Sequence, residues 1–210
     1  MSNQPEVSII DYGAGNLHSV RKAFEYIGLT AEIVTDPDAL AGARRVVLPG
    51  VGAFGDAMRS LIQNGMDQAV LSAIGSGKPF LGICLGFQLM FESGEEFAED
   101  GVLPGLGVFP GRVTRLPESV VVPHMGWNGV AAADPVIFGE EREMYVYFVH
   151  SFCCPLSDSL APHVSAVCDY GVRFAAAARR GVCLGTQFHP EKSGAAGLKI
   201  LERFGGLPIC

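Results

Sequence analysis

In the first half of the chain, short apolar runs alternate with segments in which apolar residues recur at helical spacing. Val7–Asp11 is typical of a buried strand, and Leu17, Val20, Phe24 and Ile27 then repeat every three or four residues, as on one face of a helix. The pattern continues with expected strands at Ala31–Thr35, Arg44–Leu48 and Lys78–Cys84, helical segments over Asp56–Ile74, and a helix that begins near Leu85. This order predicts an α/β fold with a largely parallel central sheet flanked by helices.

From about Gly105 onward, short β-like runs dominate the pattern. They lie at Gly107–Leu116, Val120–Pro123, Met144–Phe152, Val164–Tyr170, Val172–Ala178 and Val182–Phe188. Connections this short suit antiparallel hairpins, so additional antiparallel strands are expected in the C-terminal half. A final amphipathic helix is predicted over Ala195–Phe204. Because no repeat or linker interrupts the pattern, residues 1–210 are expected to form one domain.

Composition narrows the class of protein. Apolar residues make up 49% of the chain and charged residues 18%, which argues against disorder. No uninterrupted apolar stretch reaches the roughly 20 residues that span a membrane, and Met1–Glu6 lacks the features of a signal peptide. The net charge of −7 argues against a nucleic-acid-binding surface. A cytosolic protein with neither a membrane nor a nucleic acid as partner is therefore expected.

The chain has six cysteines, but a cytosolic protein of this length needs no disulfides. Cys168 and Cys183 lie in strand-like runs and should be buried, and Cys153 and Cys154 are adjacent. No Cys/His set has the spacing that zinc sites usually have, so no metal site is expected. Cys84 is the one thiol in a distinctive setting.

The turn Gly13-x-Gly15 permits two interpretations. A dinucleotide-binding loop would need a third glycine where His18 stands, together with an acidic residue after the second strand. A tight turn that leads into a helix capped by Asn16 fits the residues better.

Gly82-Ile83-Cys84-Leu85-Gly86 fits the G-x-C-x-G pattern of a nucleophile elbow. A sharp turn from strand to helix crowds its neighbours, which explains small residues two positions on either side of the thiol. The helix N-terminus favours thiolate, and the Leu85 amide can bind a developing oxyanion. On this pentapeptide alone, a buried cysteine whose glycines only allow close packing remains the alternative.

A thiol whose ordinary pKa is about 8.5 needs a base or a cation beside it at neutral pH. His189 is the best candidate, because it follows an expected strand and Pro190 cannot continue a ladder. Glu191 points to the same side in extended geometry and can orient the imidazole. By themselves the two could form an exposed turn; with the elbow they predict a triad of Cys84, His189 and Glu191.

A second oxyanion donor is expected from Pro49-Gly50-Val51-Gly52, at the end of a strand that should adjoin Lys78–Cys84. The glycines permit backbone conformations that turn a peptide N–H toward a substrate. The alternative is an ordinary loop that ends a strand.

Together these features resemble the class I, triad-type glutamine amidotransferases, from about Val7 to Phe204. The segments that narrow the resemblance are Asp11–Leu17, Leu48–Met58, Pro123–Asn128, Tyr147–Ser151 and His189–Ser193. They are similar to the branch whose members are glutaminase subunits that feed ammonia to a separate (β/α)8-barrel cyclase in histidine biosynthesis. That cyclase makes imidazole glycerol phosphate and an aminoimidazole carboxamide ribonucleotide.

The resemblance implies a role for each matching residue. Cys84 would attack the side-chain carboxamide of glutamine, His189 would protonate the leaving ammonia, and Glu191 would orient His189. The Val51 and Leu85 amides would stabilise the oxyanion, and glutamine would be bound by Gly50, Gly52, Gln88, Ser151 and Phe152. Phe152 stands where a tyrosine is common, so only backbone roles carry over there. The resemblance implies a heterodimer with the cyclase subunit and no cofactor or metal.

The resemblance also implies that Asn16, Trp127, Tyr147 and Lys192 face the cyclase. Each has an ordinary alternative: a helix cap for Asn16, a core residue for Trp127, a strand residue for Tyr147 and a solvated charge for Lys192. His124 and His150 also lie in matching segments, and structural hydrogen bonding is expected of them.

Two other functions stay open at this point. The glutaminase could serve a different synthase, for instance that of anthranilate or aminodeoxychorismate, although Pro123–Asn128 and His189–Ser193 argue against it. A catalytically silent docking module on the same scaffold is the other alternative. Such a module could lose the thiol or the base, whereas this chain has Cys84, His189 and Glu191.

Overall fold

The computed structural model describes residues 5–13, 15–97 and 101–209. The first four residues of Met1–Glu6, the segment without signal-peptide features, lie outside the described residues. So do Ala14 of the glycine turn and Cys210. Within the described part of the chain, no helix has the length and apolar character needed to cross a membrane.

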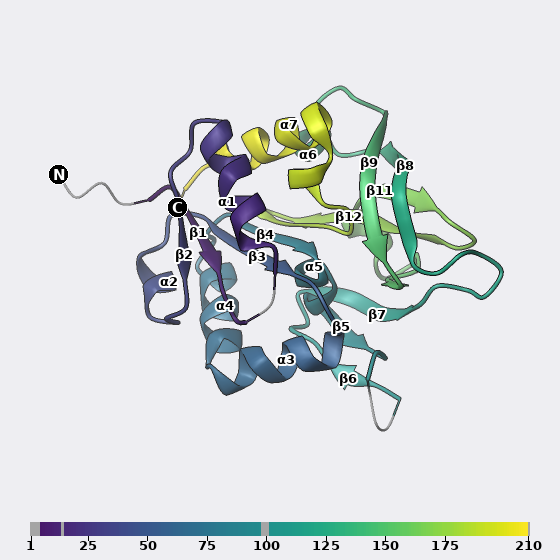
Figure 1. Cartoon of the computed structure of the whole chain (residues 1–210), viewed down its shortest axis with the longest axis horizontal. Coiled ribbons are helices and arrows are strands. Elements are labelled where there is room, and N and C mark those ends of the chain that lie inside the picture. Colours follow the sequence, from purple (N-terminus) through teal and green to yellow (C-terminus); the bar gives the residue numbers. More distant parts are fainter. Residues whose placement is uncertain (1–4, 14, 98–100, 210) are drawn as a thin grey trace.

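The chain alternates strands and helices in its first half and is rich in strands in its second (Figure 1). The strands are β1 Val7–Ile10, β2 Ala31–Val34, β3 Val46–Gly50, β4 Phe80–Cys84, β5 Phe91–Gly94, β6 Leu103–Pro104, β7 Phe109–Arg115, β8 His124–Ala132, β9 Glu143–His150, β10 Phe152–Cys153, β11 Val164–Asp169, β12 Arg173–Arg180 and β13 Cys183–Thr186. The helices are α1 Leu17–Tyr26, α2 Ala39–Gly42, α3 Phe54–Gln63, α4 Met66–Gly75, α5 Leu85–Leu89, α6 Pro135–Phe138 and α7 Gly194–Gly205, with short 3-10 helices η1 Ala161–His163 and η2 Pro190–Lys192.

One nine-stranded sheet runs through both halves of the chain in the order β2-β1-β3-β4-β13-β12-β11-β8-β9. Its strands from β2 to β13 pair in parallel, and those from β13 to β9 pair antiparallel. A smaller four-stranded sheet has the order β10-β7-β5-β6. The α/β fold expected from the sequence, with a parallel core and antiparallel C-terminal strands, is confirmed.

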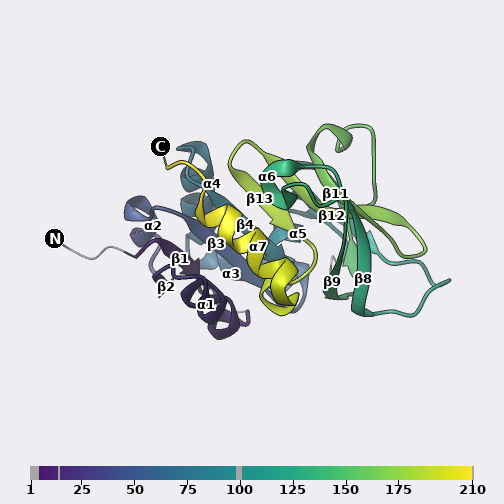
Figure 2. The same cartoon turned by 90° about the horizontal axis from the view of Figure 1, so that it is seen from above.

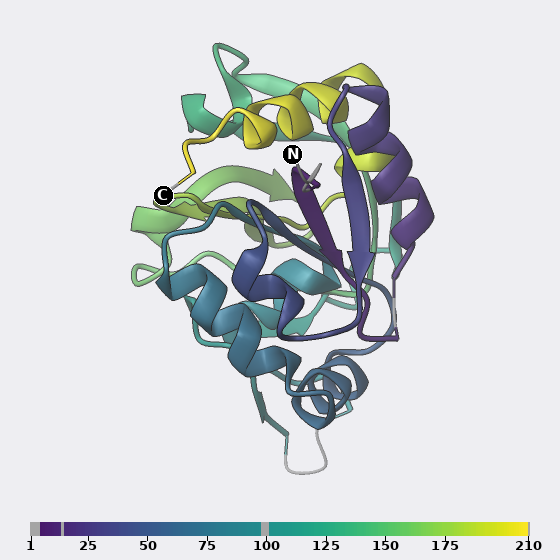
Figure 3. The same ribbon diagram turned by 90° about the vertical axis from the view of Figure 1, so that its left-hand side faces the viewer.

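Both faces of the sheet are buried at β1, β3, β4 and β13, which explains why most of the parallel strands read as continuous apolar runs. In β3, Val46 and Leu48 pack into one core cluster, and Val47 packs into the other. Helices α1 and α7 cover one face of the sheet, and α3 and α4 lie on the opposite side (Figures 2 and 3). The sheet is therefore the middle layer, and the carboxyl ends of β3 and β4 meet at one edge of it.

One expectation about local structure needs correction, and two features of the fold were not predicted. Val120–Pro123 forms turns and bends in place of a strand, because β-branched residues alone do not supply a partner strand, and Val121 is 76% exposed. The helical pattern over Asp56–Ile74 is divided into α3 and α4, since Gly65 adopts a left-handed conformation with φ of 66°. Strand β8 was missed because its pattern is reversed: Met125 and Trp127 face solvent.

Candidate active site

Cys84 lies at the turn between β4 and α5, with φ of 54° and ψ of −108°. A residue with a side chain rarely adopts this backbone conformation, and such positions cluster at functional sites. Cys84 is 6% exposed, and its thiol reaches the cavity described below. Helix α5 has only five residues, so its dipole acts over a single turn and supports a thiolate less than a long helix would.

The glycines on either side of the elbow have the packing role that the sequence predicted. A Cβ atom on Gly86 would overlap the backbone carbonyl of Leu48 on β3. A Cβ atom on Gly82 would lie 2.9 Å from the backbone nitrogen and Cα of Phe87. Backbone atoms cannot move aside as a flexible side chain can, so the sharp turn at Cys84 requires glycine at both positions.

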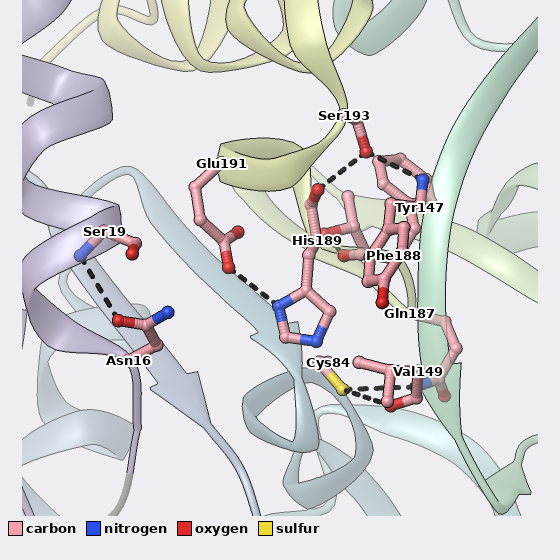
Figure 4. A network of polar contacts seen from close by, with 11 residues as sticks. Asn16, Ser19, Cys84, Tyr147, Val149, Gln187, Phe188, His189, Glu191 and Ser193 are labelled. Carbon is pink, nitrogen blue, oxygen red and sulfur yellow. Dashed lines mark hydrogen bonds and ion pairs between the residues drawn. The ribbon is translucent and has the colours of Figure 1, made fainter. Parts of the chain in front are cut away.

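His189 and Glu191 approach Cys84 from the segment after β13, which pairs in parallel with β4. His189 Nδ1 donates a hydrogen bond of 2.8 Å to Glu191 Oε1, and both side chains are nearly inaccessible to solvent. Figure 4 shows the imidazole between Glu191 and Cys84. Its Nε2 atom is buried and lacks a hydrogen-bond partner among the described residues, which leaves it available to a reacting group.

The neighbours of His189 stabilise its protonated form. Burial by itself lowers the pKa of His189, but the Cys84 thiol and the Glu191 carboxylate beside it raise that pKa to about 10. A histidine held between a cysteine and a carboxylic acid is the arrangement of a cysteine nucleophile with its base and an orienting acid.

A cavity of about 250 Å³ opens at Cys84. It is lined by Val51, Gly52, Cys84, Leu85, Gln88, Glu96, Pro123, Val149, His150, Ser151, Phe152 and His189. These include both expected oxyanion donors and all the expected glutamine-binding residues except Gly50. Gly50 pairs with Cys84 across β3 and β4. It therefore holds the next residue, Val51, beside the cavity without lining the cavity itself.

Two polar residues of the site received no role from the sequence: Glu96 in the cavity lining and Gln187 beside Cys84. Glu96 is the acidic residue of the cavity lining, and its carboxylate accepts a hydrogen bond of 2.9 Å from the Phe54 amide. Burial raises the pKa of Glu96, while that hydrogen bond lowers it in part. Gln187 Nε2 donates to the Cys84 sulfur over 3.8 Å. Glu96 comes from a segment with no local motif, whereas Gln187 lies two residues before the candidate base and could have been noticed there.

Ser193 ties the backbone of His189 to strand β9. Its hydroxyl donates a hydrogen bond of 2.7 Å to the His189 carbonyl and accepts one of 3.0 Å from the Tyr147 amide (Figure 4). The His189 amide in turn donates to the Tyr147 carbonyl over 3.0 Å. The position of His189 is therefore fixed on both sides of its Cα atom.

The remaining described cysteines have no such setting. Burial raises the pKa of Cys153, Cys154, Cys168 and Cys183 to about 12, so their thiols are expected to be unreactive at neutral pH. All the described cysteines are free thiols. No group of three or more His, Cys, Asp or Glu residues among those described is placed to hold a metal ion.

The four residues expected to face a partner have mixed environments. Trp127 is 56% exposed and packs edge-on against Tyr147, with ring centroids 6.3 Å apart. Lys192 Nζ lies 6.0 Å from the centroid of the Tyr147 ring. Asn16 caps α1 by accepting a hydrogen bond of 3.4 Å from the Ser19 amide. Trp127 is thus no core residue, whereas Asn16 does act as a helix cap.

Comparison with known proteins places this geometry in a family. The family model for class-I glutamine amidotransferases matches residues 8–205. The imidazole glycerol phosphate synthase subunit HisH of Rhodopirellula baltica is 46% identical, over 97% of this chain and 98% of that protein. The HisH subunit of Geobacter sulfurreducens is 47% identical, over 95% and 98%.

Among solved structures, PurLQS from Thermotoga maritima has the same fold, with a TM-score of 0.74 at 19% identity, over 96% of this chain and 97% of that one. At this level of identity the match speaks for the fold alone. The chain belongs to the class-I glutamine amidotransferase family and, within it, to the HisH subunits of imidazole glycerol phosphate synthase.

Proposed function

We propose that this chain hydrolyses L-glutamine to glutamate and ammonia and delivers the ammonia to the cyclase subunit of imidazole glycerol phosphate synthase, with which it forms a heterodimer. The observation that carries the proposal is the buried Cys84–His189–Glu191 arrangement, in which Cys84 and His189 line a small cavity and Glu191 binds His189. The single-domain organisation and the cytosolic location expected from the sequence are part of this proposal.

In the first half of the reaction, the Cys84 thiolate attacks the side-chain carbonyl carbon of glutamine, and the C–O π electrons move onto oxygen. The amides of Leu85 and Val51, both from residues that line the cavity, stabilise this oxyanion. When the tetrahedral intermediate collapses, the C–N bond breaks and the His189 imidazolium gives its proton to the departing nitrogen. Ammonia leaves, and a γ-glutamyl thioester remains on Cys84.

In the second half, a water molecule takes the place of ammonia. His189, now neutral, accepts a proton from that water as it attacks the thioester, and the second tetrahedral intermediate releases glutamate and the thiolate. Glu191 keeps Nδ1 protonated, so Nε2 is the atom that exchanges protons in both halves. The triad needs no cofactor for this chemistry.

The cavity offers polar groups that complement the charged and polar groups of glutamine. Glu96 can bind the α-ammonium group of glutamine, and the backbone of Ser151 and Phe152 offers further polar groups. Gln88 Nε2 donates to the Phe152 carbonyl (2.7 Å) and to Gln187 Oε1 (3.1 Å). Because both N–H groups of Gln88 are engaged, its oxygen remains to accept a hydrogen bond from the substrate.

Trp127, Tyr147 and Lys192 are proposed as part of the surface that binds the cyclase subunit, together with Asn16. Their support is an exposed Trp127 and its contacts with Tyr147 and, through that ring, Lys192. Exposed aromatic residues of this kind are enriched at the centres of protein interfaces. Service to a different synthase is disfavoured, because relatives at 46–47% identity over nearly the whole chain are HisH subunits.

The test is glutamate release from glutamine, by the chain alone and then with the cyclase subunit and its nucleotide substrate. Strong stimulation on adding both supports the glutaminase, its partner and their coupling. No glutamate under either condition contradicts the proposal and favours another synthase partner or a silent module. Cys84→Ala should abolish glutamine-dependent synthesis and leave synthesis from ammonium salts intact; loss of both activities would assign Cys84 to assembly instead.

A further inference from the structure

Two buried histidines, His124 and His150, lie beside the glutamine cavity and have no role in the triad chemistry. They are 3% and 6% exposed and stand directly opposite each other on β8 and β9. The two rings join a continuous series of hydrogen bonds. Asn128 Nδ2 contacts His124 Nε2 at 3.2 Å, His124 Nδ1 contacts His150 Nε2 at 3.0 Å, and His150 Nδ1 contacts the Phe152 carbonyl at 2.9 Å.

Chemistry fixes the direction of every bond in this series. A carbonyl oxygen only accepts, so His150 Nδ1 carries a proton and donates it to Phe152. The Nε2 atom of a neutral His150 then accepts from His124 Nδ1, and the Nε2 atom of a neutral His124 accepts from the Asn128 amide. The amide cannot be reversed, because Asn128 Oδ1 accepts a hydrogen bond of 2.7 Å from the Gly129 amide.

Packing and burial keep both rings neutral and in place. His124 is stacked between Tyr170 and Phe148, with ring centroids 3.9 and 4.7 Å away. Burial lowers the pKa of His124 to about 4 and that of His150 to about 3. A neutral histidine has one donor and one acceptor nitrogen, as this series requires at neutral pH.

The series ends at the wall of the glutamine cavity. The Phe152 carbonyl accepts from His150 Nδ1 and also from Gln88 Nε2. Residues 150–152 and Gln88 all line the cavity. The position of the Phe152 peptide and the orientation of the Gln88 amide therefore depend on the proton that His150 carries on Nδ1. His124 keeps His150 in that tautomer.

We propose that His150, held in one tautomer by His124, is a positioning residue for glutamine, which fixes the Ser151–Phe152 backbone and the Gln88 amide for substrate binding. This inference rests on the proposed function, because it names further residues of the same site. Neither histidine exchanges protons with the substrate. Their removal should weaken glutamine binding much more than it changes the reactivity of Cys84. The histidines are connected to the Cys84 sulfur only indirectly, through Gln88 and Gln187.

The test uses the full chain and measures alkylation of Cys84 by iodoacetamide, followed at that residue by peptide mass spectrometry. The alkylation rate without glutamine measures the reactivity of the Cys84 thiolate. The glutamine concentration that halves this rate, the half-protecting concentration, measures the affinity for glutamine. His150→Leu, which has no polar side-chain atom, should raise the half-protecting concentration at least about tenfold, the effect of about 1.4 kcal/mol. His150→Asn keeps a donor near the position of Nδ1 and should stay within about threefold of the wild type.

His124→Phe is the second variant, because phenylalanine keeps the stacking on Tyr170 and Phe148 and removes only the hydrogen bonds. It should raise the half-protecting concentration by roughly threefold to tenfold. His163→Leu is the matched control, a partly buried histidine of η1 whose ring packs against Phe109, away from the cavity lining. It should leave both measurements unchanged.

The outcomes separate the two proposals. Wild-type protection by glutamine with unaltered values in His150→Leu and His124→Phe would overturn the positioning role and leave the glutaminase standing. Equal losses in His150→Leu and His150→Asn would also overturn it, because the donor at Nδ1 would then be irrelevant. A wild-type thiol that glutamine never protects would overturn the proposed function itself and, with it, this inference.

Discussion

Ser193 offers a test of how the backbone, as well as the triad, fixes His189. The side chain is 1% exposed, and its hydroxyl links the His189 carbonyl to the Tyr147 amide. Ser193→Ala removes that oxygen and leaves the fold of η2 unchanged, since alanine accepts the same backbone conformation. The His189 amide keeps its hydrogen bond to the Tyr147 carbonyl. In the variant the His189 backbone is therefore less restrained, but it stays attached to β9.

The magnitude follows from the partners that remain. The His189 carbonyl still accepts from the Lys192 amide at 3.1 Å, so losing the serine costs about 1 kcal/mol there. The Tyr147 amide loses its bond to Ser193 at a part-buried position, which costs about 1–3 kcal/mol. We expect Ser193→Ala to lower the free energy of unfolding by about 2–4 kcal/mol and to lower kcat by roughly tenfold, with a smaller change in KM.

The assay pairs urea unfolding with glutaminase kinetics in the presence of the cyclase subunit. Ser165→Ala is the control: Ser165 is also 1% exposed and donates one hydrogen bond, to Asp134, and neither residue lines the cavity. It should lose stability and keep wild-type kcat. Wild-type kcat in Ser193→Ala, or an equal loss of activity in Ser165→Ala, would show that Ser193 does not position His189.

Three further predictions concern the triad, the elbow and the core. Glu191→Gln removes a negative charge that raises the pKa of His189. Because the protonated imidazole is lost as pH rises through that pKa, the alkaline limb of the kcat/KM profile should move to lower pH. The value of kcat should fall at least about 100-fold. An unchanged alkaline limb would contradict the assignment. Gly86→Ala places a Cβ atom on a backbone carbonyl of β3 and should cost about 3 kcal/mol or more in urea unfolding. The control Gly75→Ala, in open space at the end of α4, should be neutral or stabilising. Tyr12→Phe removes a buried hydroxyl without a hydrogen-bond partner among the described residues, so the melting temperature should hold or rise; a clear fall would mean that the hydroxyl has a partner in solution.

Local properties of the chain were readable from the sequence. Apolar runs predicted the parallel strands because both faces of that half are buried, so no alternation hides them. The elbow at Cys84 was readable because its steric demand falls on Gly82 and Gly86, within the same five residues. The adjacency of β3 and β4 was also expected, whereas the register that pairs Gly50 with Cys84 came from the structure.

Strand β8 was not readable, although its residues were noticed as a motif. It turns His124 inward and Met125 and Trp127 toward solvent, the reverse of the usual alternation. A periodicity argument assumes that polar residues face water, and here buried partners satisfy the polar rings instead. Periodicity and β-propensity also misled at Val120–Pro123, because these residues favour a strand but do not pair with one in the structure.

The sequence by itself determined which residues are suited to thiol chemistry, because residue type and short-range spacing decide what Cys84, His189 and Glu191 can do. Only the tertiary structure decided that they meet, since β13 inserts next to β4 and carries His189 from the other half of the chain to the elbow. It also decided that Ser193 and the two buried histidines support the site. Strand order and hydrogen-bond partners depend on which distant surfaces are buried together, and no local pattern encodes that choice.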